Sequence, residues 1–224
     1  VYEASKKKVF THTLPSAPTA GTFANDLVEM TAPYKQTRIQ LSVGDTLMLY
    51  TDGFEEASRA RRNSSFNQLY ETKIIKDRDG TDSEFREPMV EQLGDERIIE
   101  ITEAIFNKGS YTLKKEDDPL GANILYEFDF RSIDASIEDL VMGLAAVEKV
   151  FRMIPDPSAG AESKILVDSK VDAFLAKCWK DYRLYCHDRQ PHPNPQRKEY
   201  IYYGHLKEDE QYDDLTMMVI KRNK

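Results

Sequence analysis

Two aspartate-bearing segments near opposite ends of the chain contain residue types that suit metal chemistry. In the first, apolar residues 47–50 are followed by Thr51, Asp52 and Gly53. In the second, Asp213 and Asp214 precede the apolar residues 217–220. If the two apolar runs are antiparallel strands, the end of one lies beside the start of the other, at one edge of the sheet. Carboxylate oxygens gathered at such an edge suit a hard divalent cation such as Mg²⁺ or Mn²⁺.

Each motif also has a simpler interpretation when it is taken alone. An Asp-Gly pair after a strand commonly forms a turn, and an Asp-Asp pair before a strand is commonly a solvated cap. The combination favours metal ligation, because Gly44-Asp45 opens the first strand and Glu56-Ala57 follows the Asp52 turn. Asp45 itself is predicted to be a turn residue and not a ligand.

The order of these motifs resembles that of the metal-dependent PPM-type protein phosphatases, in the SpoIIE-like bacterial branch. The resemblance rests on Leu-Tyr-Thr-Asp-Gly at 49–53 and on Asp-Asp-x-Thr at 213–216 before a final apolar run. Near the beginning of the chain, a small hairpin and a Pro/Gly-rich turn are expected before the Gly-Asp turn. A helix start at Leu93-Gly94-Asp95-Glu96-Arg97 extends the likeness.

The resemblance implies a role for five residues. Asp52 and Asp213 would be ligands of a catalytic cluster of two Mn²⁺ or Mg²⁺ ions, and Gly53 would keep the backbone beside the metal free of a side chain. Asp214 and Thr216 would be positioning residues. The implied chemistry is hydrolysis of phosphoserine or phosphothreonine by metal-activated water, so no residue of this chain is expected to act as a nucleophile.

A haloacid-dehalogenase-like phosphatase is a rival interpretation of the same aspartates. Such enzymes use the aspartate after the first strand as a nucleophile and place a second aspartate two positions later. Here Phe54 occupies that position, and residues 208–211 before the Asp-Asp pair are polar instead of forming an apolar strand. Both departures favour the PPM-type interpretation.

The chain is expected to be an incomplete phosphatase domain, 1–224, which lacks its N-terminal half. Residues 1–40 offer only Glu3, Asp26 and Glu29 as carboxylates, and none lies in a motif resembling the family's other metal-binding segment. Two insertions are expected, a short one at 60–92 and a larger, mainly helical one at 108–205. We therefore expect the fragment by itself to be inactive.

The predicted fold class is α+β, the C-terminal portion of a two-sheet β-sandwich flanked by helices. The near-continuous apolar runs 47–50 and 217–220 predict strands that are neighbours in one sheet and covered on both faces. A strand is also expected at 122–130, and a tyrosine-rich strand at 199–206.

Two helices are predicted inside the larger insertion. Ser136 and Asp139 form a capping-box pattern for a helix that Pro155 ends. Asp168 caps a second helix, whose apolar stripe extends to Tyr182. Cys178 and Cys186 are eight residues apart on this helix, which is too far for a disulfide. Free cysteines fit a reducing cytoplasm.

Composition limits the partners of the chain. Lys and Arg number 31 against 39 Asp and Glu, which gives a formal net charge of -8 and argues against nucleic acid. The basic runs 6–8 and 59–62 are predicted to be solvated loops, although Arg59, Arg61 and Arg62 could instead meet phosphate. No apolar stretch of the sequence approaches the length of a membrane span, so no membrane contact is expected from this segment.

These observations predict the C-terminal part of a cytoplasmic serine/threonine phosphatase that acts on a phosphorylated regulatory protein. It could be the output domain of a larger, membrane-anchored sensor, and its helices could pair in a homodimer. The alternative is a non-catalytic interaction or regulatory module on a phosphatase scaffold, in which the insertion binds a partner.

Overall fold

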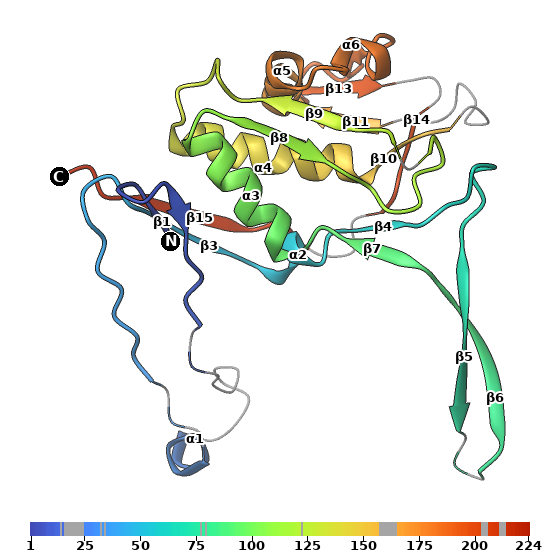
Figure 1. The fold of residues 1–224 in the computed structure, drawn as a ribbon, viewed down its shortest axis with the longest axis horizontal. Helices are drawn as coiled ribbons and strands as arrows, with labels where there is room; N and C mark the ends of the chain where they lie inside the picture. Colours follow the sequence, from blue (N-terminus) through green and yellow to red (C-terminus); the bar gives the residue numbers. More distant parts are fainter. Residues whose placement is uncertain are drawn as a thin grey trace. The chain divides into compact units, whose positions relative to one another are not determined.

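The computed structural model describes residues 1–13, 15, 25–31, 33, 35–76, 78, 80–121, 123–156, 165–202, 206–210 and 214–224 (Figure 1). The chain divides into two compact units, Val1–Met48 with Val219–Lys224, and Leu49–Met218. The described residues form six helices and six small sheets, which confirms the α+β class. The pairing of two sheets into a sandwich stays a prediction.

A four-stranded sheet joins the two ends of the sequence. Its strand order is β15-β3-β1-β2, and its members are β1 (Tyr2–Glu3), β2 (Lys8–Val9), β3 (Thr46–Tyr50) and β15 (Met217–Lys221). Strands β1 and β2 form an antiparallel hairpin, as predicted. The two apolar runs of the sequence are neighbours in this sheet, so that prediction is confirmed. A short helix, α1 (Asn25–Thr31), lies between β2 and β3 in the sequence.

Asp45 shapes the turn that leads into β3. Gly44 adopts a φ of +92°, a conformation that residues with a side chain rarely adopt. The buried carboxylate of Asp45 accepts hydrogen bonds from the backbone N–H groups of Ala4, at 2.9 Å, and Ser42, at 2.8 Å. Asp45 is therefore a turn residue, as predicted.

The prediction that both apolar strands are covered on both faces is wrong within the described residues. Leu49 is 45% exposed on β3, while Met218 and Ile220 are 58% and 46% exposed on β15. Successive side chains of a strand point to opposite faces of a sheet. The alternation along β15 therefore shows that one face is more exposed than the other.

The core of the second unit is built from helices and short sheets. Helix α4 packs against both α3 and α5. The helices are α2 (Asp52–Glu55), α3 (Gly94–Phe106), α4 (Ile137–Arg152), α5 (Ser169–Cys178) and α6 (Tyr182–Tyr185). The paired strands are β8 (Ser110–Leu113) with β9 (Tyr126–Asp129), β10 (Met153–Pro155) with β14 (Leu206–Glu208), and β11 (Ile165–Asp168), β13 (Glu199–Tyr202) and β12 (Gln190–Pro191) in one sheet. Among the helices in these ranges, none is both long and apolar enough to span a membrane.

The predicted start of α4 is confirmed. The Ser136 hydroxyl accepts a hydrogen bond from the Asp139 N–H at 3.0 Å, and the Asp139 carboxylate accepts one from the Ser136 N–H at 3.0 Å. The helix ends at Arg152, before Pro155. Gly143 allows close packing, because a Cβ at this position would lie 2.4 Å from Cδ1 of Ile105 on α3.

The region of the predicted short insertion, 60–92, forms a long hairpin. Strands β4 (Ser58–Ala60) and β7 (Val90–Gln92) pair at its base, and β5 (Tyr70–Lys76) pairs with β6 (Asp82–Pro88) beyond them (Figure 1). Every residue of β5 is exposed. The hairpin therefore projects away from the remainder of its unit.

Three boundary predictions in the larger insertion are wrong. The strand expected at 122–130 is limited to β9, with Ala122 outside the described residues, and the segment 199–206 forms two strands with different partners. The second helix begins after Asp168, as predicted, but it ends at Cys178. Trp179 adopts an extended backbone and bridges to Phe128, which interrupts the helix. Cys178 and Cys186 consequently lie on separate segments, where burial raises the pKa of their thiols to about 11 and about 12.

Candidate functional site

Asp52 occupies the first position of the four-residue helix α2, with its side chain exposed. The following residues, Gly53 and Phe54, are buried. The Phe54 ring packs edge-on against Tyr50, with the ring centroids 6.5 Å apart. The buried ring of Phe54 therefore holds the loop in place, while the carboxylate of Asp52 faces solvent.

Thr51 joins this loop to the segment that precedes β15. Its N–H donates to the carbonyl of Thr216 at 3.0 Å, and its hydroxyl donates to the carbonyl of Asp214 at 2.9 Å. The same hydroxyl oxygen accepts a hydrogen bond from the Thr216 N–H at 3.2 Å. The two segments singled out in the sequence are thus in direct contact.

The structure places four of the five candidate residues. Asp52 and Gly53 lie in the loop, while Asp214 and Thr216 meet Thr51 through backbone atoms. Asp213 lies outside the described residues. The ligand roles of Asp52 and Asp213, and the positioning roles of the other three, stay predictions.

Negative charge surrounds Asp52. The carboxylate of Asp95, followed by partial burial and by Glu56 and Asp52, raises the pKa of Glu55. Asp95 belongs to the first turn of α3, and it accepts a hydrogen bond from the Tyr50 hydroxyl at 2.6 Å. Burial, together with this hydrogen bond, raises the pKa of Tyr50, so its hydroxyl remains a donor.

Sequence reasoning missed Glu55 and Asp95 as neighbours of Asp52. Glu55 could have been found, because it lies in the same loop. Asp95 is far along the sequence and was interpreted only as part of a helix start. Its proximity depends on the packing of α2 beside α3, which no local pattern reveals.

These residues fit a divalent cation in kind. Carboxylate oxygens are suitable ligands for Mg²⁺ and Mn²⁺, and a cation would relieve the repulsion among the acidic groups. Within the described ranges, the Asp52 carboxylate has neither a hydrogen-bond donor nor an ion-pair partner. No group of three or more His, Cys, Asp or Glu residues placed to hold a metal occurs there either.

The basic run 59–62 is not a solvated loop, so that prediction is wrong. The Arg59 side chain is 1% exposed and pairs with Glu91 at 2.7 Å. Arg61 pairs with Glu116, and Arg62 pairs with Asp209 at 2.5 Å. All three guanidinium groups are engaged by carboxylates: Arg59 is buried on strand β4, while Arg61 and Arg62 follow the strand and are partly exposed.

Comparison with known proteins relates the first part of this chain to a phosphatase family. Residues 1–100 match the Stage II sporulation protein E (SpoIIE) family. The SpoIIE match includes the Asp52 loop and the start of α3. It covers 100 of the 224 residues, and the Asp-Asp-x-Thr segment at 213–216 lies beyond it. No curated protein and no solved structure matches the chain.

Proposed function

We propose that this chain is the C-terminal part of a SpoIIE-like serine/threonine protein phosphatase of the PPM type. The observation that carries the proposal is the contact of Thr51 with residues 214 and 216, beside the exposed Asp52 carboxylate. The SpoIIE match over residues 1–100 supports it independently. The substrate would be a phosphoserine or phosphothreonine in a regulatory protein of the cytoplasm.

Asp52 and Asp213 would hold the metal ions in this proposal. Bound Mn²⁺ or Mg²⁺ would supply a water of lowered pKa and would neutralise phosphate charge. The protein's own residues fix the geometry, because the three hydrogen bonds of Thr51 hold the backbone next to Asp52. Tyr50 fixes Asp95 nearby, and Asp95 adds to the negative potential that attracts a cation.

The proposal includes the prediction that residues 1–224 are an incomplete phosphatase domain, which lacks its N-terminal half. Residues 1–224 by themselves should be inactive, because residues 1–40 carry no motif that resembles the family's other metal-binding segment. The segments 60–92 and 108–205 would be insertions into the phosphatase domain.

The test is Mn²⁺-dependent hydrolysis of a phosphoserine peptide. Residues 1–224 are compared with the same chain extended upstream by about one hundred residues of its own gene, a length typical of half a large domain. Asp52→Asn and Asp213→Asn are made in the longer protein. Asp82→Asn, on the exposed strand β6, is the matched control.

Activity that is lost in both site variants and kept in the control would support the phosphatase and its two ligands. Turnover by residues 1–224 alone would contradict the predicted inactivity. A longer protein that folds but hydrolyses nothing would overturn the proposed enzyme.

A non-catalytic interaction module is the second candidate. One observation favours it: the hairpin β5–β6 exposes apolar side chains, with Ile74 68% and Phe85 51% exposed. Exposed apolar residues on a projecting element suit contact with another protein. An inert longer protein that still binds a partner through this hairpin would favour the module.

A further inference from the structure

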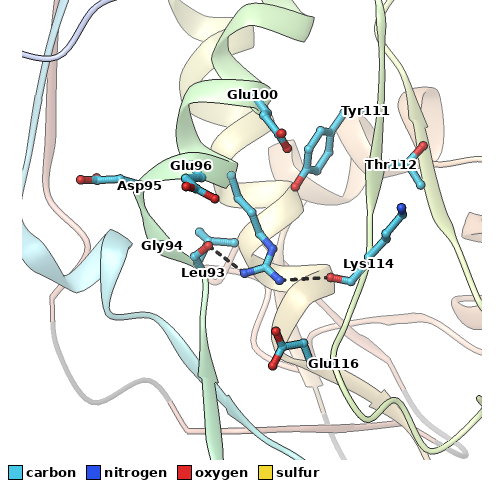
Figure 2. A pocket seen from close by; sticks show the side chains of 10 residues that line it. Leu93, Gly94, Asp95, Glu96, Glu100, Tyr111, Thr112, Lys114 and Glu116 are labelled. Carbon is cyan, nitrogen blue, oxygen red and sulfur yellow. Dashed lines mark hydrogen bonds between the residues drawn. The ribbon is translucent and has the colours of Figure 1, made fainter. Parts of the chain in front are cut away.

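A pocket of about 660 Å³ lies between helix α3 and strand β8, inside the second unit (Figure 2). Glu96 and Glu100 line it from the helix, while Tyr111 and Lys114 line it from β8 and the residue that follows. The Asp95 carboxylate points away from the other labelled side chains in Figure 2 and is held by Tyr50. Asp95 also lines the pocket, but its carboxylate lies on the side of the Asp52 loop, apart from the side chains of Glu100 and Tyr111.

Tyr111 is the buried polar group of this pocket. Its side chain is 6% exposed, its ring packs on Phe128, and its hydroxyl points into the pocket (Figure 2). Within the described part of the chain, no residue forms a hydrogen bond with this hydroxyl. Burial raises the pKa of Tyr111, so the hydroxyl is neutral. The ring of Tyr111 is buried while its hydroxyl opens into the pocket, so the hydrogen-bonding capacity of this hydroxyl is available to a bound group.

The helix side of the pocket carries two exposed carboxylates beside the Arg97 guanidinium. Glu96 and Glu100 are four residues apart, so they lie on the same face of α3, where like charges repel. Both side chains are exposed, and neither forms an ion pair with a described residue. A cation bound between them would remove this repulsion.

The basic residues of the pocket do not form an anion site. The Arg97 guanidinium donates to the carbonyls of Gln92, at 2.8 Å, and Leu93, at 3.1 Å, and also to the Glu91 carboxylate and the Lys114 carbonyl. These bonds occupy most of its donors. Lys114 is exposed and remains as a single ammonium group at the rim.

We propose that this pocket binds a guanidinium group, which donates to the carboxylates of Glu96 and Glu100 and to the Tyr111 hydroxyl oxygen. A guanidinium has five N–H donors in a planar fork and is weakly hydrated, so it suits several acceptors around a partly buried site better than an ammonium does. It could come from an arginine side chain of a protein partner or from a free small guanidine. The proposal does not depend on the metal site or on phosphatase activity.

Calorimetric titration of residues 1–224 with a blocked Ala-Arg-Ala peptide tests this site. The same peptide with citrulline in place of arginine keeps the shape but lacks the charge. Binding of the arginine peptide and none of the citrulline peptide is expected, and equal binding of the two would overturn the proposal. Agmatine identifies the source: binding as tight as that of the peptide indicates a free guanidine, and binding of the peptide alone indicates a protein partner.

Variants of the lining residues sharpen the test. Glu100→Gln should weaken binding about tenfold, and Tyr111→Phe about fivefold, as expected for a charged and a neutral hydrogen bond. Glu84→Gln, which removes an exposed charge from the hairpin, should change nothing.

Lys114→Gln distinguishes a cation site from an anion site without disturbing the core. Removal of the ammonium should tighten binding of the arginine peptide by about twofold, since an exposed charge contributes little. Weaker peptide binding in this variant, or binding of inorganic phosphate that Lys114→Gln abolishes, would overturn the proposal.

Discussion

Carboxylates in two regions of the second unit have opposite surroundings. Around Asp52, the carboxylates gather without a cationic side chain among the described residues, and Asp95, followed by burial, Glu56 and Asp52, raises the pKa of Glu55. Around Glu91, which is 6% exposed, a carboxylate is matched by arginines on two sides. The negative charge of the carboxylates therefore has no basic partner around Asp52 in the described part of the chain, whereas around Glu91 it is balanced by arginines.

The compensated region forms part of the core. Arg59 donates through Nε to Oε2 of Glu91 at 2.8 Å, and the Glu116 N–H donates to the same oxygen at 2.9 Å. Arg97 pairs with the other oxygen, Oε1. Both guanidinium groups lie over the ring of Phe151, at 5.8 Å and 5.4 Å from its centroid. Ions removed from water to this extent persist only when they are paired and hydrogen-bonded.

The contrast between paired and unpaired carboxylates indicates which acidic residues of this protein have a structural role and which are available to a ligand. A buried, paired carboxylate stabilises the fold, and its removal leaves the arginines that it pairs with without a charged partner. An exposed carboxylate beside other carboxylates stabilises nothing locally and remains available to a ligand. Substitutions in the two regions should therefore affect different measurements.

The largest loss of stability is expected for Glu91→Gln. It leaves the buried Arg59 and the partly exposed Arg97 without a charged partner, and breaking a buried ion pair typically costs about 3–5 kcal/mol. Urea denaturation of residues 1–224 measures the change. If the free energy of unfolding falls no more than it does for the exposed control Glu84→Gln, the ion pairs of Glu91 do not stabilise the fold.

Lys115 gives the core a dependence on pH. Burial, aided by Arg59, lowers the pKa of Lys115 to about 7 from 10.5, and its ammonium donates to the Met153 carbonyl at 2.6 Å. Between these values the unfolded chain binds a proton that the folded protein does not, so stability should rise with pH.

The expected gain from this group is about 2 kcal/mol between about pH 7.5 and pH 9. Below about pH 7 both states are protonated, and the full penalty applies. Lys115→Met should remove this slope in denaturation measured at both pH values. An unchanged slope in the variant would assign the pH dependence to other groups.

An intermediate effect is expected for Asp209→Asn. This side chain is 17% exposed, and it accepts hydrogen bonds from the Ala60 N–H at 2.8 Å and from Arg62 at 3.0 and 2.5 Å. An asparagine keeps one acceptor oxygen but loses the charge, so the loss should be about 1 kcal/mol. Thermal or urea denaturation measures the change. A loss of stability as large as that of Glu91→Gln would show that partial exposure does not weaken the contribution of a paired carboxylate.

The smallest effect on stability is expected for Asp52→Asn. The Asp52 side chain is exposed among like charges, so residues 1–224 should unfold within about 0.5 kcal/mol of the parent chain. In the longer protein, the same change should lower Mn²⁺ affinity. Strong destabilisation of residues 1–224 would instead identify Asp52 as a structural turn residue.

Local patterns determined several elements correctly. Ser136 and Asp139 predicted the start of α4 because a capping box involves only neighbouring residues. The Gly44-Asp45 turn follows from a similarly short-range rule, whereas the start of α3 was expected from the family resemblance. The match of residues 1–100 to the SpoIIE family agrees with the resemblance noted at the Thr-Asp-Gly loop.

Local sequence patterns therefore predicted the turns and the helix cap of this protein, and the resemblance of its two aspartate motifs to a known family predicted that β3 and β15 are neighbours. Tertiary structure alone decided that Arg59 is buried, that Asp95 lies beside the Asp52 loop, and that Trp179 ends α5 by bridging to Phe128. It also created the pocket around Tyr111. The physical reason is range, because caps and turns depend on adjacent residues, whereas burial and charge compensation depend on segments that only folding brings together.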